Sequence, residues 1–167
     1  MARTGEQGSS LIESLVAMAL VLVSIAGLGS MGVVGLTSTE NDGHLAARCT
    51  EYAQDKMEQL LVLTYGDTTS DTRVFPAATS GGTGLGIGGS AAVAAPVVGF
   101  VDYLDQNGNL LVSSGSAPAN WFYVRVWSVT SPSTNLKQIT VTASVKHPMG
   151  GRQAPISTVV ALKTFPF

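Results

Sequence analysis

Hydrophobic and polar positions divide the chain into an apolar N-terminal segment, an amphipathic segment and a C-terminal part in which the two kinds alternate. The apolar segment, residues 14–39, contains no ionisable side chain and lies between Glu13 and Glu40. About 20 predominantly apolar residues suffice for a helix to cross a bilayer, so this segment is long enough. It exceeds the apolar region of about 7–15 residues of a cleavable secretory signal, which indicates that it is retained.

The residues before the apolar segment predict its orientation. They carry Arg3 and the α-amino group against Glu6. Because positive charge favours the cytoplasmic side, the short N-terminal end is expected in the cytoplasm and the long C-terminal part outside it.

Apolar residues continue after the span at three- and four-residue steps, as on one face of a helix. The apolar positions are Ala46, Cys49, Ala53, Met57, Leu60 and Leu61, and the charged positions opposite them are Arg48, Glu51, Asp55 and Glu58. The combined pattern predicts one helix over about residues 10–63. Cys49, the single cysteine, forms no internal disulfide and is interpreted as a small buried hydrophobic residue.

Residues 66–96 are rich in Gly, Ser, Thr and Ala, which predicts a long loop over the helix or the sheet. Within it, Gly84, Gly86 and Gly89 fit a G-x-G-x-x-G string. Dinucleotide binding requires a strand before such a string and a helix after it, and neither flank predicts one.

The C-terminal part alternates as strands do, and turn residues separate the alternating runs. The predicted strands are 97–104, 110–112, 121–129, 139–145 and 156–162, and the predicted turns are 105–108, 131–135 and 147–151. Short links between successive strands predict an antiparallel meander, whose apolar face the amphipathic helix can cover. The expected fold class is α+β, with a long N-terminal helix packed on a C-terminal antiparallel sheet over residues 97–165.

Two groups of residues invite a binding hypothesis. Asp105, Asn107 and Asn109 match the first positions of a calcium loop, but Leu110 stands where Gly is expected and the bidentate Glu is missing. A hairpin with an Asn-Gly turn explains the same residues. On strand 121–129 one face carries Trp121, Tyr123, Arg125 and Trp127, which predicts either a half-exposed sheet face or an aromatic ligand-binding patch with Arg125 stacked between rings.

Composition and motifs give no support to catalysis or nucleic-acid binding. The two histidines, His44 and His147, have no Ser or Cys partner at motif spacing, and the metalloprotease, serine-hydrolase and paired-carboxylate patterns are missing. Only 12% of residues are charged and the net charge is −2, so no basic surface for nucleic acid is expected. We therefore expect no enzyme, no metal and no cofactor.

The start of the apolar segment resembles the type IV prepilins and pseudopilins. Gly8 matches the last leader residue, Ser9 the first mature residue, Leu11 and Ile12 the apolar pair, and Glu13 the glutamate five places after the glycine. Ser9 stands where the family usually has Phe. Residues 53–60 extend the likeness to minor pilins of the pilus-modification kind.

This resemblance implies cleavage after Gly8 by a prepilin peptidase, which needs an extended scissile backbone that glycine adopts readily. It further implies N-methylation at Ser9 and filament assembly through Glu13, whose partner would be the new α-ammonium at Ser9. An unpaired acid deep in an apolar span is costly, so Glu13 marks a function unless it is a flanking charge at the headgroup level. Residues expected in the membrane are Leu11, Ile12, Leu15, Val16, Leu20 and Leu22.

The implied organisation is a leader, residues 1–8, a transmembrane and filament-core helix, 9–40, and a globular head, 41–167. The implied function is that of a minor type IV pilin in the bacterial inner membrane and then in a pilus. Its implied partners are other pilin or pseudopilin subunits, the prepilin peptidase and the inner-membrane assembly platform. The alternatives are a minor pseudopilin of a type II secretion or DNA-uptake system and, in another class, a membrane anchor that displays a β-rich ligand-binding domain.

Overall fold

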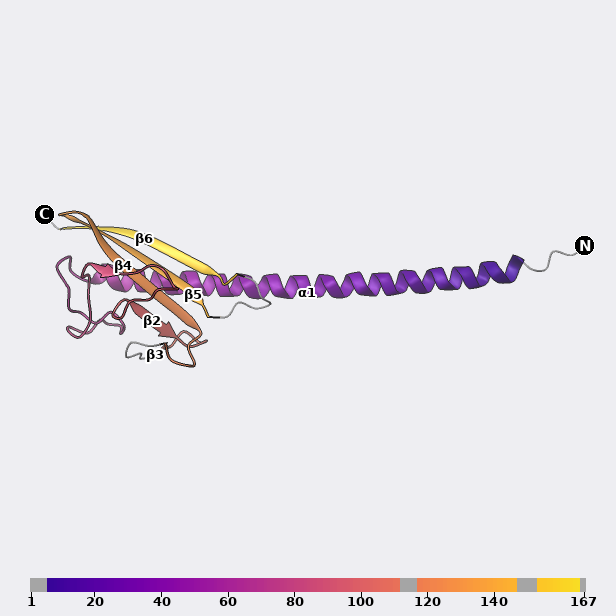
Figure 1. Ribbon diagram of the computed structural model, residues 1–167, viewed down its shortest axis with the longest axis horizontal. Helices are drawn as coiled ribbons and strands as arrows, with labels where there is room; N and C mark the ends of the chain where they lie inside the picture. The colour runs from indigo at the N-terminus through magenta and orange to yellow at the C-terminus, as the bar shows by residue number, and fades with distance from the viewer. Residues whose placement is uncertain (1–5, 112–116, 147–152, 166–167) are drawn as a thin grey trace, which may run out of the picture. The chain divides into compact units, whose positions relative to one another are not determined.

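The computed structural model describes residues 6–111, 117–146 and 153–165, with side chains from residue 11 onward except at 37–38 (Figure 1). The chain divides into two compact units, Met1–Asn41 and Asp42–Phe167, which are described separately. The described elements are helix α1 (Glu6–Val62) and strands β1 (Gly88–Gly89), β2 (Val101–Leu104), β3 (Leu110–Leu111), β4 (Tyr123–Ser133), β5 (Leu136–Val145) and β6 (Ile156–Thr164).

The first unit is the apolar part of α1, which begins at Glu6 rather than near residue 10. It includes a stretch near the N-terminus that is long and apolar enough to span a membrane, with a mean hydropathy of 2.4. Polar side chains in this stretch bond within the helix, which removes the cost of leaving them unpaired in an apolar medium. The hydroxyls of Ser24, Ser30 and Thr39 donate to the carbonyls of Leu20, Gly27 and Gly35 over 2.8, 2.8 and 2.9 Å.

The second part of α1 buries one face, and the prediction of that face is correct in its centre and wrong at its ends. Cys49, Ala53, Met57 and Leu60 are buried as predicted. By contrast, Ala46 and Leu61 are exposed. Four further residues are buried: Tyr52, Lys56 and Gln59 of α1, and Leu63 directly after it.

All strand pairs are antiparallel, and the strand order is β3-β2-β4-β5-β6, with β1 also paired with β4. The predicted meander is wrong at β2, which pairs with both β3 and β4, so the chain passes from one side of β2 to the other. Alternation in the sequence gives the face of each residue but not the partner of each strand. The hairpins β2–β3, β4–β5 and β5–β6 connect neighbours as expected.

The predicted strand bounds differ from the observed ones at two turns. Residues 97–100 precede β2 as a turn, in which the Phe100 N–H donates to the Val97 carbonyl. The predicted turn 131–135 is wrong at its first three residues, because β4 continues through Pro132 to Ser133. The register shifts after Thr130, and proline is tolerated where the pairing is irregular. The end of the predicted strand 110–112, at Val112, lies outside the described residues, as does the predicted turn 147–151.

The loop 66–96 contains β1, which the sequence did not predict. At Gly89, φ is +80°, and an added Cβ would lie 2.3 Å from the Trp127 carbonyl oxygen and 2.7 Å from the Phe100 ring. Only glycine fits this approach to β4. The last glycine of the G-x-G-x-x-G string is therefore required for packing of the loop on the sheet.

The core of the second unit lies between α1 and the sheet, which confirms the α+β layout. On β5, Ile139, Val141, Ala143 and Val145 share the buried face, as the alternation predicts. They pack with Met57 and the other buried apolar residues of α1. A second cluster on the opposite face of the sheet comprises Tyr103, Val124 and Val126, with Val93, Val101 and Trp121 packed against it.

The segment after β2 is a hairpin, as the Asn-Gly pattern predicts. The Asp105 Oδ1 accepts the backbone N–H groups of Asn107 and Asn109 over 2.8 and 2.9 Å, and Oδ2 accepts the Asn109 side-chain amide. These bonds stabilise the ionised carboxylate and lower the pKa of Asp105.

We therefore expect that EDTA leaves the thermal midpoint of the protein unchanged, because this carboxylate already has its partners. The measurement is a melt followed by near-UV circular dichroism with and without added calcium. A rise in the midpoint with calcium that EDTA reverses would favour the calcium-loop hypothesis instead.

Candidate functional site

The residues that carry the prepilin resemblance lie at the start of α1. Gly8 and Ser9 are within its helical backbone, which differs from the extended backbone expected at a scissile bond. The side chain of Ser9 lies outside the described part of the structure. Glycine lowers helix stability by about 1 kcal/mol relative to alanine, so Gly8 reduces the cost of opening this first turn.

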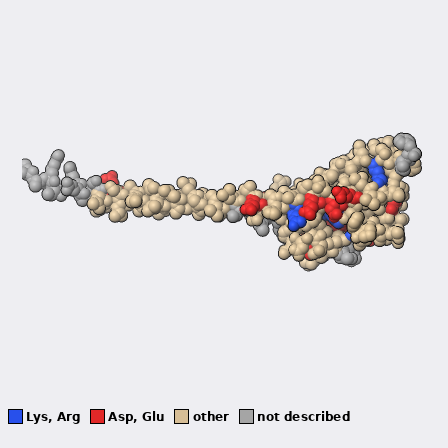
Figure 2. All heavy atoms as spheres, turned by 180° about the vertical axis from the view of Figure 1, so that it is seen from behind, with Lys and Arg blue, Asp and Glu red and all other residues tan. Residues whose placement is uncertain are grey.

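Glu13 lies in an exposed apolar surface of the first unit. It shares one side of the helix with Ile12, Val16, Ala17 and Leu20, as helical spacing requires. The six residues expected in the membrane are all exposed, with exposed fractions of 50–69%: Leu11, Ile12, Leu15, Val16, Leu20 and Leu22. Figure 2 shows this part of α1 as a surface interrupted by charge only near its two ends. A carboxylate in such surroundings requires a partner once water is excluded.

The second unit contains a buried ionic cluster between α1, β2 and β4, which the sequence analysis did not predict. Asp102 Oδ2 lies 2.8 Å from Lys56 Nζ and 2.7 Å from Arg125 Nε. The side chains of Lys56 and Asp102 are completely buried, and that of Arg125 is 5% exposed. Arg125 Nη1 also contacts Asp55 Oδ2 at 2.6 Å. Two cations and two carboxylates thus compensate one another across the helix–sheet interface.

Lys56 holds this cluster to the loop after the helix. Its ammonium donates to the Thr72 carbonyl and lies 4.1 Å from the centroid of the Trp127 ring. Burial lowers the pKa of Lys56 from 10.5 to about 8, although the nearby Asp102 carboxylate acts in the opposite direction.

This shift predicts how stability depends on pH. Between pH 8 and 10.5 the unfolded chain binds a proton at Lys56 that the folded chain has lost, so the free energy of unfolding rises with pH. The expected contribution is up to about 3 kcal/mol. Cys49, whose pKa burial raises from 9.0 to about 11, contributes in the opposite direction above pH 9.

The difference between the protein and its Lys56→Met variant isolates this contribution. Urea unfolding between pH 7 and 10 should show a free energy of unfolding that increases with pH relative to the variant. Parallel pH profiles for the two proteins would contradict the lowered pKa of Lys56.

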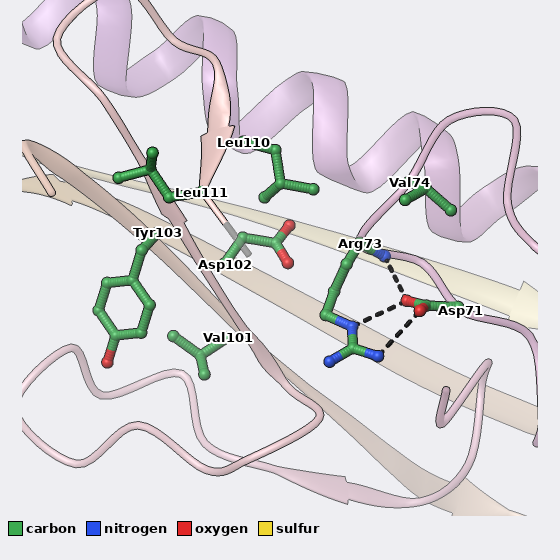
Figure 3. Close-up of a pocket in the computed structure, with 8 residues that line it drawn as sticks. All are labelled: Asp71, Arg73, Val74, Val101, Asp102, Tyr103, Leu110 and Leu111. Carbon is green, nitrogen blue, oxygen red and sulfur yellow. Dashed lines mark hydrogen bonds and ion pairs between the residues drawn. The ribbon is translucent and has the colours of Figure 1, made fainter. Parts of the chain in front are cut away.

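A small pocket of about 120 Å³ lies beside this cluster at β2 and β3 (Figure 3). The ion pair of Asp71 and Arg73 forms one wall, with Arg73 Nη2 lying 2.8 Å from Asp71 Oδ2. The other walls are largely apolar, and Asp102 contributes to the lining. The described residues contain no group of three metal-ligating side chains, here or elsewhere.

The hypotheses for the aromatic face of β4 are wrong in both forms. Tyr123, Arg125 and Trp127 point into the helix–sheet core and are buried. Trp121 precedes β4 and packs on the opposite face, with its ring centroid 5.5 Å from that of Tyr103. Arg125 is therefore an ion-pair residue and is inaccessible to an aromatic ligand. Of the two histidines, His44 is exposed and His147 lies outside the described residues.

The residues missed by sequence reasoning are Lys56, Asp102 and the Asp71–Arg73 pair. One signal was present: Lys56 lies three residues after Ala53 and four before Leu60, which is the helical spacing of the buried face.

Comparison of the chain with protein-family models, curated proteins and solved structures finds no match.

Proposed function

We propose that the chain is a minor type IV pilin, a structural subunit that is processed by a prepilin peptidase and joins a filament through its N-terminal helix. The observation that carries the proposal is Glu13, an exposed acid at the head of an apolar helical surface, five residues after Gly8. The amphipathic second part of the same helix belongs to the core of an α+β unit, which supplies a head for such a subunit. The resemblance of the sequence around Gly8 and Glu13 to the prepilins supports the same proposal.

The proposed location is the bacterial inner membrane, with the head on the extracytoplasmic side, followed by the filament. The proposed partners are other pilin subunits, the prepilin peptidase and the inner-membrane assembly platform. No catalytic activity, cofactor or nucleic-acid partner is part of the proposal. A pseudopilin of a secretion or DNA-uptake system has the same residues, and the kind of filament that contains the protein distinguishes the two.

Fractionation of cells tests the proposal. In a strain with a prepilin peptidase, the protein should appear both in the inner membrane and in filaments sheared from the cell surface. In an otherwise identical strain without the peptidase it should remain in the membrane. A membrane anchor with a β-rich ligand-binding domain would stay in the membrane of both strains, and that result would contradict the proposal.

A further inference from the structure

The two edges of the sheet differ in length. β3 forms one edge with two residues, and β6 forms the other with nine. Pairing of β6 with β5 continues without a register shift from Ile156 to Thr164. In the described part of the chain, no other backbone hydrogen bond involves β6. About half of its N–H and C=O groups therefore point away from the sheet and have no partner among the described residues, since a strand bonds to each side through alternate groups.

The features that usually prevent strand addition are missing from β6. Natural edge strands are protected by proline, bulges, lysine or a covering segment. β6 contains no proline and no bulge, and Lys163 is its only charged residue. The ammonium of Lys163 donates to the Leu61 carbonyl over 2.5 Å, so it is directed toward α1 rather than along the free edge.

The outward side chains of β6 fit an apolar, uncharged partner strand. Ile156, Val160 and Leu162 alternate along the strand and are 58%, 55% and 61% exposed. Cross-strand neighbours at these positions would cover them and add to the backbone bonds. The chemistry of the edge thus favours an extended segment with alternating apolar side chains and few charges.

A second copy of the chain fits this edge poorly. Head-to-tail pairing would offer only the two residues of β3 to the nine of β6. Pairing of β6 with β6 uses the same edge on both copies, so it is an isologous contact with two-fold symmetry. Such a contact closes on two copies, whereas subunits of a helical filament repeat through contacts between two different surfaces.

We propose that the free edge of β6 binds an extended segment of a different subunit in the same filament, by strand addition. This inference rests on the proposed function, because the partner is a filament subunit. Strand addition would give the chain one particular neighbour in the filament. A subunit that any identical copy could replace would need no such neighbour.

Photo-crosslinking in cells that assemble filaments tests the proposal. The full chain carries benzoylphenylalanine in place of Ile156, and crosslinked peptides are identified by mass spectrometry. The expected product joins β6 to one extended segment of a non-identical filament subunit. Val160→Lys combined with Leu162→Lys, both at exposed positions, should reduce this product about tenfold, a loss of about 1.4 kcal/mol in pairing.

Val74→Lys combined with Phe75→Lys is the matched control, because both residues are exposed on the loop before β1. This variant should give the same product in the same amount as the parent. A product formed with a second copy of the chain, an unchanged yield in the β6 variant, or no product from a chain that enters filaments would contradict strand addition while leaving the proposed function intact. Absence of the chain from sheared filaments would contradict the proposed function and, with it, the partner assigned here.

Discussion

Asp102→Ala is expected to lower the free energy of unfolding by about 3–5 kcal/mol. The substitution removes the carboxylate that lies 2.8 Å from Lys56 Nζ and 2.7 Å from Arg125 Nε. It leaves the buried Lys56 ammonium next to Arg125, whose remaining ion-pair partner is the half-exposed Asp55. A buried charge that loses its partner cannot regain water without opening the interface between α1 and the sheet. Chemical unfolding of the full chain in detergent, followed by near-UV circular dichroism, measures the loss.

Two variants serve as controls for this prediction. Asp71→Ala breaks the more exposed pair with Arg73, so it should cost no more than about 1 kcal/mol. In a Lys56→Met background, Asp102→Ala should cost less than in the parent, because one of the two cations is already absent. Equal losses for Asp102→Ala and Asp71→Ala would show that the cluster does not hold the helix to the sheet.

Glu13→Ala is expected to leave the protein cleaved and in the inner membrane but to reduce its amount in sheared filaments more than about tenfold. The carboxylate lies among apolar side chains, and in a filament core the α-ammonium freed at Ser9 is its candidate partner. Attraction between such charges at about 4 Å is on the order of 4 kcal/mol at an effective dielectric constant of about 20. Each 1.4 kcal/mol corresponds to a factor of about ten in an equilibrium constant, so the loss should be easy to detect by immunoblotting of the two fractions.

Glu40→Ala is the matched control, because Glu40 is the exposed acid that follows the apolar segment. It should enter filaments as the parent does. Normal incorporation of Glu13→Ala would show that Glu13 is a flanking charge at the membrane surface. Loss of cleavage would instead assign Glu13 to recognition by the peptidase.

Local periodicity accounts for the parts of the fold that the sequence predicts correctly. The helix, the buried face of β5 and the hairpin at Asp105 each follow from residues a few positions apart. The order of β2, β3 and β4 depends on pairing between distant segments, and no local pattern encodes it. Sequence reasoning gave the helix-on-sheet layout and missed the route of the chain through the sheet.

The ionic cluster could not be predicted for a related reason. Lys56, Asp102 and Arg125 are far apart in the sequence, and each alone is typical of an exposed position. Their burial is tolerated only because the fold brings opposite charges within hydrogen-bond distance. The aromatic residues near Arg125 suggested a ligand site for the same reason. The sequence does not show that Asp55 and Asp102 pair with Arg125 in the fold.

The N-terminal residue of the mature protein tests the central proposal most directly. Intact-mass analysis and N-terminal sequencing of the protein from cells with a prepilin peptidase should show a chain that begins at Ser9, while the Gly8→Val variant should remain at full length in the membrane. A mature chain that begins at Met1 or within the apolar segment 14–39 would contradict the assignment to the prepilin class.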